Sequence, residues 1–337
     1  MKVGIIGCGA VAERAHIPSF RRAGAEIFAL ADIDTRQAER LAKRFKVPHV
    51  YHDYHELLAG DVDLVSICTP PKSHAGIAVD AVRAGKHVLL EKPMATSLED
   101  AERLARECSS SKVKVCIMHQ YRLIPCIQEA KKTILRGSVG NVLAIQTTAH
   151  SEFPMKWSDA SWLRDKWSLL DDIGVHYLDI LNFFTEGHPR RAFVTARDVT
   201  GKMGFFNYIQ AVIDLAGSCV AYFDLSWVTG SYEASAQLFG TSGKIDIDVR
   251  NDFLSESHGN PTPFDEISTT VRKARHTFGR VLSKEAFRGP LLYHDLLIRS
   301  FLESIARNQE PPVSAEEGKR TVEYMEMIKR AAIEEAS

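Results

Sequence analysis

The sequence predicts a doubly wound α/β domain with a parallel sheet, followed by an α+β domain with a large, mostly antiparallel open sheet. In the first part of the chain, short apolar runs alternate with amphipathic stretches, a pattern typical of right-handed strand–helix–strand units. After Tyr121, longer strand-like runs follow one another through tight turns, and strands joined in that way cannot be parallel. A chain of 337 residues is long enough for two domains, which we place at residues 1–120 and 121–337.

Each element of the first domain has a local signal. Apolar runs predict strands at residues 3–6, 26–31, 64–68, 88–90 and 114–118. Helical periodicity predicts helices at residues 10–23, 35–45, 73–84 and 98–109. Gly85 suits the end of the third helix, and Thr96 or Ser97 suits the start of the fourth.

The second domain is richer in strands. A helix at residues 127–136 ends at Gly137, and strands are predicted at residues 142–150, 192–199, 208–215, 219–227, 234–239 and 244–249. Ala216-Gly217 and the segment 240–243 are predicted hairpin turns. The polar segment 251–263 predicts a loop, and helices are predicted at residues 270–287, 291–306 and 315–332. We expect the C-terminal helices to pack back towards the first domain.

Composition and charge exclude several classes of protein. The 42 Lys and Arg residues balance 43 Asp and Glu residues, so a net charge of -1 gives no reason to expect a nucleic acid or a membrane surface as partner. No apolar run reaches the roughly 20 residues that a membrane helix needs. Residues 1–6 run directly into a strand rather than forming a signal peptide, so we expect a cytoplasmic protein.

The cysteines predict neither a disulfide framework nor a metal centre. They are scattered and form no Cys-x-x-Cys pair, so we expect free thiols in a reducing compartment. No histidine or cysteine cluster has the spacing of zinc ligands, and we expect no metal. Residues 51–55 hold two histidines, but we interpret them as a loop and a helix start. The six cysteines are Cys8, Cys68, Cys108, Cys116, Cys126 and Cys219.

A glycine-rich turn follows the first strand. Gly7, Gly9 and Ala12 form the pattern G-x-G-x-x-A at the start of a predicted helix. The first glycine permits a tight turn, the second lets the backbone approach a pyrophosphate, and the small third residue lets helix and strand pack closely. The N–H groups of this helix start, which includes Ala10 and Val11, would face the phosphates. The segment therefore predicts a Rossmann dinucleotide site.

Residues at two further strand ends suit the same cofactor. Asp32 ends the second strand, where an acid favours NAD over NADP by binding ribose hydroxyls and repelling a 2′-phosphate. It could instead cap the next helix, and the nearby Arg36 keeps NADP open. Thr69-Pro70-Pro71 ends the third main strand and holds an open turn, or is a structural turn only. His74 is either an ordinary helix residue or a cofactor contact.

Two groups of polar residues carry candidate chemistry. Glu91-Lys92-Pro93 follows a strand, which places Lys92 where a partly desolvated lysine can polarise a carbonyl or help deprotonate an alcohol. The alternative is a strand-end lysine in solvent.

On a helix, Asp172, His176 and Asp179 would share one face. A histidine with an ordinary pKa near ~6.5 and a carboxylate neighbour is a reasonable general base, although such histidines are usually hydrogen-bonding groups only. Asp179 we interpret as structural.

Taken in chain order, these motifs resemble those of one family. The turn at residues 7–12, Asp32, Thr69-Pro70-Pro71-x-x-His74, the run 84–88, Glu91-Lys92-Pro93 and Asp172-x-Gly174-x-His176-x-x-Asp179 are similar to the Gfo/Idh/MocA oxidoreductases. This is the family of glucose–fructose oxidoreductase and inositol dehydrogenase, and the resemblance spans nearly the whole chain. It implies a tightly held NAD(H) or NADP(H), and a C-terminal sheet that commonly forms oligomer contacts. We therefore expect a homo-oligomer, either a dimer or a tetramer.

The resemblance also implies roles for individual residues. Lys92 matches the catalytic lysine of the family and His176 its catalytic histidine, while Asp172 matches a position that orients substrate or histidine. Gln120-Tyr121-Arg122 resembles the segment beneath the nicotinamide at the domain junction. We expect Gln120 and Glu91 to contact the cofactor, and Tyr121 and Arg122 to contact the substrate.

One departure from the family pattern concerns the substrate loop. Many members carry a glycine-rich stretch before the aspartate of D-x-G-x-H, whereas residues 166–170 of this chain contain no glycine. The preceding segment 161–167 is bulky and charged, and it resembles members that oxidise C3 of nucleotide-linked acetamido sugars. We expect Trp162, in this segment, to contact the substrate.

The resemblance implies an NAD(P)-dependent oxidoreductase acting on a secondary alcohol or ketone of a sugar, cyclitol or nucleotide sugar. Two alternatives are a redox-neutral sugar-modifying enzyme that retains NAD and a nicotinamide-binding sensor, although a sensor has no need of Lys92, Asp172 and His176. The basic segment 270–287 is either a solvated helix at a domain or oligomer edge or a source of an arginine for a substrate phosphate. Its basic residues are Arg272, Lys273, Arg275, Arg280 and Lys284.

Overall fold

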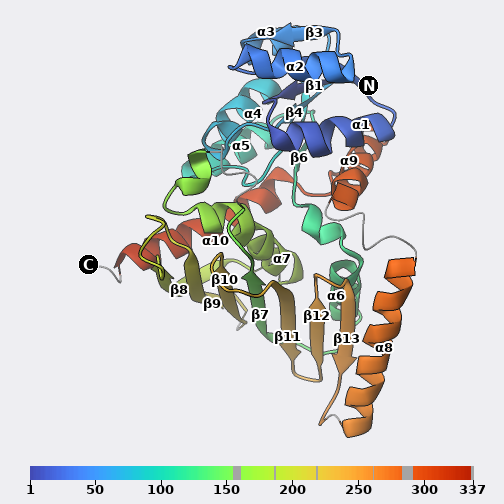
Figure 1. Ribbon diagram of the computed structural model, residues 1–337, viewed down its shortest axis with the longest axis vertical. Helices are drawn as coiled ribbons and strands as arrows, with labels where there is room; N and C mark the ends of the chain where they lie inside the picture. The colour runs from blue at the N-terminus through green and yellow to red at the C-terminus, as the bar shows by residue number, and fades with distance from the viewer. Residues whose placement is uncertain (155–160, 186, 218, 261, 283–290, 335–337) are drawn as a thin grey trace. The chain divides into compact units, whose positions relative to one another are not determined.

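A computed structural model of the chain describes residues 1–154, 161–185, 187–217, 219–260, 262–282 and 291–334 (Figure 1). The chain divides into two compact units. Unit 1 comprises Met1–Gln120 and Pro290–Val322, and unit 2 comprises Tyr121–Gly289 and Glu323–Ser337. The last boundary along the chain, between Val322 and Glu323, falls inside helix α10 (Ala315–Glu334). Among the helices of the described residues, none is both long and apolar enough to cross a membrane.

Unit 1 contains a six-stranded sheet in the order β3-β2-β1-β4-β5-β6. All of its pairings are parallel, which confirms the predicted Rossmann sheet. The strand order reverses between β1 and β4, and dinucleotides bind outside the carboxyl ends of strands at such a point. The strands are β1 (Lys2–Ile6), β2 (Glu26–Ala31), β3 (His49–Tyr51), β4 (Leu64–Ile67), β5 (His87–Leu90) and β6 (Val115–Ile117).

The elements of unit 1 follow the prediction with three differences, at η1, β3 and α3. Residues Ala12–His16 form a π turn, η1, so the first helix is not a continuous α-helix. Strand β3 and helix α3 were not predicted as separate elements, although the helix start expected near residue 54 is confirmed. The other helical elements are α1 (Ile17–Arg22), α2 (Thr35–Phe45), α3 (Tyr54–Ala59), η2 (Pro71–Ser73), α4 (His74–Arg83), α5 (Leu98–Ser109) and α9 (Leu291–Ala306).

Helix α9 joins unit 1 although it lies far along the chain. Its apolar residues Leu297, Ile298 and Phe301 are fully buried. Arg22 of α1 donates a hydrogen bond of 2.9 Å to the carboxylate of Asp295, and Ser19 donates another to the same group. Unit 1 is therefore built from two separated stretches of sequence.

Unit 2 contains a seven-stranded sheet in the order β13-β12-β11-β7-β10-β9-β8. Only β7 and β10 run parallel, so the prediction of a mostly antiparallel sheet is confirmed. Helices α6 (Pro125–Leu135) and α7 (Val175–Thr185) pack against one face of it, where they contact β12 and β7 (Figure 1). The strands are β7 (Val142–His150), β8 (Pro189–Arg197), β9 (Tyr208–Leu215), β10 (Val220–Ser226), β11 (Glu233–Gly240), β12 (Lys244–Asp248) and β13 (Phe253–Ser257).

The loop predicted at residues 251–263 is wrong. Part of it forms β13, which pairs with β12 through its backbone, and helix α8 (Pro263–Leu282) already begins at Pro263. The polar sequence of β13 is compatible with its place at the edge of the sheet, where polar side chains face solvent. Lys284, predicted as part of this helix, lies outside the described residues.

Candidate functional site

The candidate cofactor residues of unit 1 all follow the carboxyl ends of strands. Gly7 follows β1, Asp32 follows β2, Thr69 lies just beyond β4, Glu91 follows β5 and Gln120 begins the turn η3 (Gln120–Leu123) after β6. Because these strands are parallel, their carboxyl ends share one edge of the sheet. The structure thus brings residues from five separate motifs to the edge at which dinucleotides bind.

The glycine-rich turn has the geometry that its sequence requires. Gly7 has a φ of +90°, and an added Cβ would lie 2.7 Å from the carbonyl carbon of Cys68 and 2.8 Å from the nitrogen of Thr69, so only glycine fits. At Gly9 an added Cβ would meet nothing within 4 Å. Packing within the chain therefore does not demand this second glycine, whereas an approaching pyrophosphate would. Ala10 and Val11 open the helix, and Ala12 is fully buried.

Asp32 closes the turn from the neighbouring strand. One carboxylate oxygen accepts a hydrogen bond of 2.6 Å from the Cys8 N–H, and the other accepts one of 2.8 Å from the Asp34 N–H. The N-cap of α2 is Asp34, whose side chain accepts from the N–H of Arg36, so the alternative that Asp32 caps this helix is wrong. Each oxygen of Asp32 keeps acceptor capacity for a ribose hydroxyl.

His74 links two of the strand ends. Its ring nitrogens lie 2.7 Å from the carbonyl oxygens of Thr69 and Pro93, and the ring is buried. Burial lowers the pKa of His74 against the opposing effect of the two carbonyls. Both ring nitrogens thus face the protein's own backbone, and the ring supports the turn formed by Thr69-Pro70-Pro71.

Glu91 is part of a buried polar cluster next to Lys92. One carboxylate oxygen lies 2.7 Å from Nε2 of His16, and the other accepts the Lys92 N–H at 3.2 Å. The other ring nitrogen of His16 lies 2.7 Å from the hydroxyl of Ser66 in β4. Lys92 itself is half-buried. The cluster therefore anchors the strand end that carries the lysine to the helix of the glycine turn.

This cluster holds opposite charges. Burial disfavours the charge of Glu91, but hydrogen bonding to His16 and the charges of His16, His294 and Lys92 outweigh it and lower the pKa of Glu91 to about 2. Burial likewise disfavours the charge of His16, but Cys68 and Glu91 outweigh it and raise the pKa of His16 to about 10. His16 and Glu91 are therefore an ion pair at neutral pH.

The same cluster has the composition of a metal site but the geometry of hydrogen bonding. Ligand atoms of His16, Glu91 and His294 lie within 4.8 Å of one another. Both nitrogens of His16 are at hydrogen-bond distance from Ser66 and Glu91, which explains the arrangement without an ion. Sequence reasoning missed this cluster. The signal that could have revealed it is His16 in a predicted helical segment with apolar neighbours, because a buried histidine needs a polar partner.

In unit 2 the candidate residues lie at the start of one long helix. Residues Leu170–Gly174 form a π turn, η6, which continues into α7. An added Cβ at Gly174 would lie 2.7 Å from a methyl carbon of Leu225 in β10, so glycine lets this helix pack closely on the sheet. Asp172 and His176 lie on opposite sides of the junction between π turn and α-helix, and the simple one-face geometry of a continuous α-helix does not apply to them.

His176 is held by an aromatic ring. The rings of Tyr121 and His176 stack at a centroid distance of 4.2 Å and an interplanar angle of 11°. Tyr121 lies in η3, directly after the end of unit 1 in the chain. Asp172 is half-buried, and so is Trp162 in the short turn η5 (Ser161–Arg164). The stack fixes the plane of the imidazole proposed to handle the proton.

Arg122 and Asp179 form a buried bidentate pair. The arginine donates hydrogen bonds of 2.8 Å and 2.7 Å from Nε and Nη2 to the two carboxylate oxygens. Both residues are buried, and the guanidinium also lies over the ring of Phe183. The pairing of Asp179 with Arg122 agrees with the structural role predicted for Asp179. Arg122 was predicted to contact the substrate, but two of its side-chain nitrogens bind Asp179 within unit 2.

Comparison with known proteins agrees with these two units. Residues 1–119 match the profile of the Gfo/Idh/MocA oxidoreductase family with its NAD-binding Rossmann fold, and residues 127–246 match the Gfo/Idh/MocA C-terminal domain. These matches define a dehydrogenase acting on CH–OH groups. The chain belongs to the Gfo/Idh/MocA family.

Individual relatives differ in activity and in how much of the chain they share. The chain is 29% identical over 198 residues to D-apiose dehydrogenase of Paraburkholderia graminis, covering 58% of this chain and only 52% of that relative. It is 22% identical over 329 residues to myo-inositol 2-dehydrogenase of Thermotoga maritima, covering 95% and 92% of the two chains.

A solved structure extends the similarity across the fold. The WlbA dehydrogenase from Bordetella pertussis, in complex with NADH and UDP-GlcNAcA, superposes with a TM-score of 0.84 at 20% identity, covering 99% of this chain and 96% of that chain. At this identity the likeness concerns the fold alone.

Proposed function

We propose that the protein is an NAD-dependent dehydrogenase that oxidises a secondary alcohol of a sugar, cyclitol or nucleotide sugar to a ketone. The observation that carries this proposal is the alignment of five motifs along the carboxyl edge of the parallel sheet, with Lys92 directly after β5. The relatives support the substrate class, since they include enzymes named for D-apiose and myo-inositol.

The residues present suit NAD. The backbone of Gly7, Gly9, Ala10 and Val11 would hold the pyrophosphate, where the open space at Gly9 permits close approach. Asp32 would accept ribose hydroxyls and repel a 2′-phosphate, so we propose NAD rather than NADP. Thr69-Pro70-Pro71 and Gln120 would lie along the cofactor. His74 and Glu91 we now assign to positioning these segments, because their polar atoms are engaged by the protein.

The chain's own residues would handle the proton and the charge. The bound nicotinamide supplies a hydride acceptor. His176 takes the hydroxyl proton, with its ring plane set by Tyr121 and its orientation assisted by Asp172. Lys92 donates a hydrogen bond to the same oxygen and stabilises its developing negative charge. Trp162 contacts the sugar, and Arg122 positions α7 through Asp179.

Substitution of the two reactive residues tests this proposal. Lys92→Ala and His176→Asn should each lower kcat by about 10²- to 10⁴-fold with folding intact, because each removes a group that acts on the proton or the charge. The readout is reduced-nicotinamide absorbance with NAD+ and with NADP+ across inositols, aldoses and UDP-acetamido sugars. Lys112→Ala and His188→Asn, at exposed positions, are matched controls.

Each result of that assay has a distinct meaning. Near-normal turnover of both variants would overturn the assigned roles, and equal use of NADP+ would overturn the assignment of Asp32. Consumption of a sugar without net NADH would favour a redox-neutral enzyme that retains NAD. Binding of NAD without consumption of any member of the panel would favour a sensor.

A further inference from the structure

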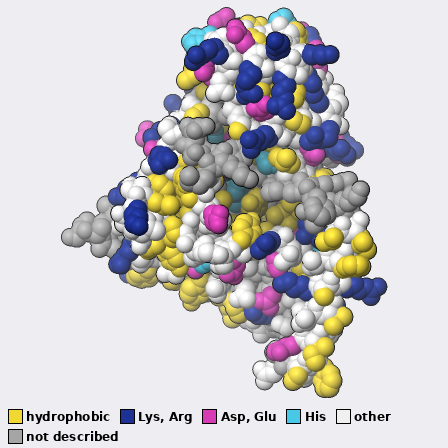
Figure 2. All heavy atoms as spheres, in the orientation of Figure 1, with side chains coloured by type: hydrophobic (Ala, Val, Ile, Leu, Met, Phe, Trp, Pro, Cys, Tyr) yellow, Lys and Arg dark blue, Asp and Glu magenta, His cyan; other side chains and the backbone are white. Residues whose placement is uncertain are grey.

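Lys329 is a lysine whose side chain lies largely beneath the surface. Lys and Arg side chains are scattered over the outside of the molecule in Figure 2, as is usual for groups that keep their charge in water. The side chain of Lys329 is only 15% exposed, and its amine lies 2.8 Å from a carboxylate oxygen of Asp171, which is 14% exposed. Because little solvent screens this pair, removing either charge would leave the other uncompensated.

The helix that carries Lys329 is firmly anchored in unit 2. Earlier in α10, the Tyr324 hydroxyl donates a hydrogen bond of 2.7 Å to the carbonyl oxygen of Gly187, and the Tyr324 ring is fully buried. Met325 and Ile328 are buried as well. Met325 lies four residues before Lys329, so the lysine leaves the helix from the same packed side. The amine therefore has a fixed base from which to hold Asp171.

Asp171 belongs to the π turn η6 and comes directly before Asp172. Its N–H donates a hydrogen bond of 3.0 Å to the carbonyl oxygen of Trp167, so its backbone is part of the helical turn. A π turn inserts one residue into a helix, and such turns are frequent at functional sites. The contact that Asp171 makes with Lys329 therefore acts on the same turn that carries Asp172.

The sequence places two carboxylates next to each other in this turn. Asp171 and Asp172 both lie partly buried in η6, where like charges at neighbouring positions repel each other. The amine of Lys329 compensates the first of them. Without that cation, Asp171 would turn towards water or compete for the polar neighbours of Asp172, and either change would shift the turn.

We infer that Lys329 and Asp171 are positioning residues for the oxidation of the alcohol: their ion pair holds η6 so that Asp172 keeps the orientation of His176. This inference rests on the proposed function, in which His176 takes the hydroxyl proton. Both positioning residues act through the turn rather than on the reacting atoms. A displacement of about 1 Å in a group that handles a proton can lower the rate about 10²-fold, so turnover should depend on this pair.

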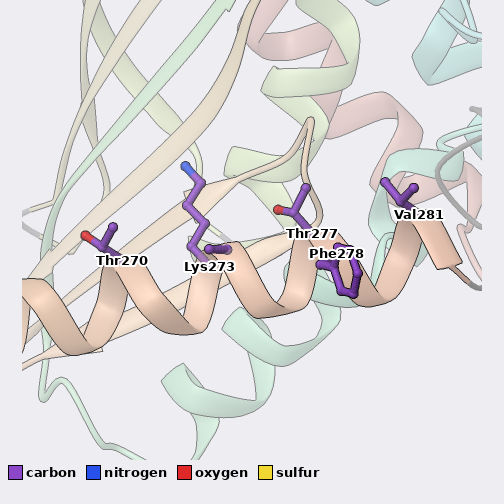
Figure 3. A pocket seen from close by; sticks show the side chains of 6 residues that line it. Thr270, Lys273, Thr277, Phe278 and Val281 are labelled. Carbon is purple, nitrogen blue, oxygen red and sulfur yellow. The ribbon is translucent and has the colours of Figure 1, made fainter.

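A second lysine–aspartate pair of unit 2 gives a matched control. Lys273 of α8 lies 2.6 Å from a carboxylate oxygen of Asp248 in β12, but this lysine is 46% exposed, and no residue of α8 is buried. Figure 3 shows Lys273 extending from α8 beside a pocket that Thr270 and Thr277 also line. Exposed pairs contribute little. Lys273→Met therefore repeats the substitution of Lys329→Met at a pair in which η6 takes no part.

Hydrogen exchange of the full chain, followed by mass spectrometry, tests the pair without any substrate. Lys329→Met and Asp171→Asn should each speed amide exchange in peptides covering residues 168–178 at least about tenfold, because each leaves a largely buried partner uncompensated. Peptides of β9 in these variants, and residues 168–178 of Lys273→Met, should stay within about twofold of the unaltered chain. Unchanged exchange of residues 168–178, or faster exchange across the whole of unit 2, would overturn the inference.

Turnover tests the link to His176, with the panel alcohol that the unaltered chain oxidises. Lys329→Met should lower kcat about 10- to 100-fold while the KM for NAD+ stays within about twofold, because the change moves the proton acceptor and not the dinucleotide site. Asp171→Asn, which keeps the shape of the side chain, carries the same test if Lys329→Met does not fold.

A double variant shows whether the two residues act as one contact. Asp171→Asn combined with Lys329→Met should lose no more kcat than the worse single variant, since both changes remove the same ion pair. Losses that multiply would overturn the inference. A raised KM for the alcohol with normal kcat would also overturn it, because that result indicates a direct substrate contact.

The two measurements separate this inference from the proposed function. If the unaltered chain binds NAD+ but oxidises no member of the panel, the proposed function fails and the role in catalysis fails with it, even where exchange confirms that Lys329 holds the turn. If turnover is found but exchange and kcat are both indifferent to Lys329→Met, the proposed function stands and this inference alone is overturned.

Discussion

The buried pair of His16 and Glu91 joins three segments of unit 1. His16 ends the π turn of the first helix, Ser66 belongs to β4, and Glu91 precedes Lys92 after β5. Removing one partner of a buried charge pair leaves the other uncompensated, which costs about 3–5 kcal/mol. The pair therefore couples the position of the proposed catalytic lysine to the helix that follows the glycine turn.

The stability supplied by this pair should depend on pH in both directions. The pKa of Glu91 falls from its ordinary 4.5 to about 2, so its contribution is present above pH 4.5 and lost as the pH falls through 2. The pKa of His16 rises from 6.5 to about 10, so its contribution is present below pH 6.5 and lost as the pH rises through 10. The pair should stabilise the folded protein most between pH 4.5 and pH 6.5, which are the ordinary pKa values of the two groups.

Urea unfolding of the unaltered chain and of His16→Gln checks this window. The difference in unfolding free energy should be about 3–5 kcal/mol near pH 6 and should shrink towards pH 10. His55→Gln, at an exposed histidine of α3, controls for general effects of pH. A difference that stays constant from pH 6 to pH 10 would contradict the ion pair.

Motif residues could be predicted from the sequence, whereas their supporting partners could not. Gly7 has a predicted strand before it and a predicted helix after it. Lys92 has a predicted strand before it and Pro93 after it. His16 and Glu91 are 75 positions apart, and only the sheet order brings them together. The pairing of Arg122 with Asp179 was missed because the two residues are 57 positions apart in the chain, and because Arg122 taken alone suits a substrate contact.

At the scale of elements, the contact between Gly174 and Leu225 sets how closely η6 and α7 approach the sheet. Gly174→Ala should lower the unfolding free energy by about 1–3 kcal/mol, because the new methyl group overlaps packed side chains. Gly76→Ala in α4, where an added Cβ meets nothing within 4 Å, should raise it by about 0.5–1 kcal/mol. Urea unfolding measures both, and a stabilised Gly174→Ala variant would show that this packing is loose.

Elements with strong periodicity were predicted almost residue for residue. Helices α2, α5 and α9 and strands β2, β7 and β9 have the predicted bounds, since each has a clear apolar pattern and a marked end. Strands β3 and β13 were missed because short edge strands depend on backbone pairing rather than on buried side chains. The π turns η1 and η6 were missed because one inserted residue in a helix leaves little trace in periodicity.

At the scale of the whole molecule, unit 1 should need its distant segment to fold. The fragment 1–120 lacks α9, whose Leu297, Ile298 and Phe301 are fully buried. Exposing or losing such side chains costs about 1.5–3 kcal/mol each, against a typical total stability of about 5–15 kcal/mol. We expect fragment 1–120 to unfold without a cooperative transition, and the same fragment joined by a flexible linker to residues 290–322 to unfold cooperatively. Equal cooperativity in thermal circular dichroism would contradict this.

The parallel pairing of β7 with β10 has a consequence for how this enzyme diversifies. Two parallel neighbours cannot be joined by a tight turn, so the chain between them makes a long excursion that includes Trp162, Asp172 and His176. The register of the two strands sets no limit on the length of that excursion. The part of this excursion that precedes β8 can therefore change in descendant sequences while the sheet and the dinucleotide fold keep their strand pairing, and under the proposed function such changes would alter which alcohols are oxidised.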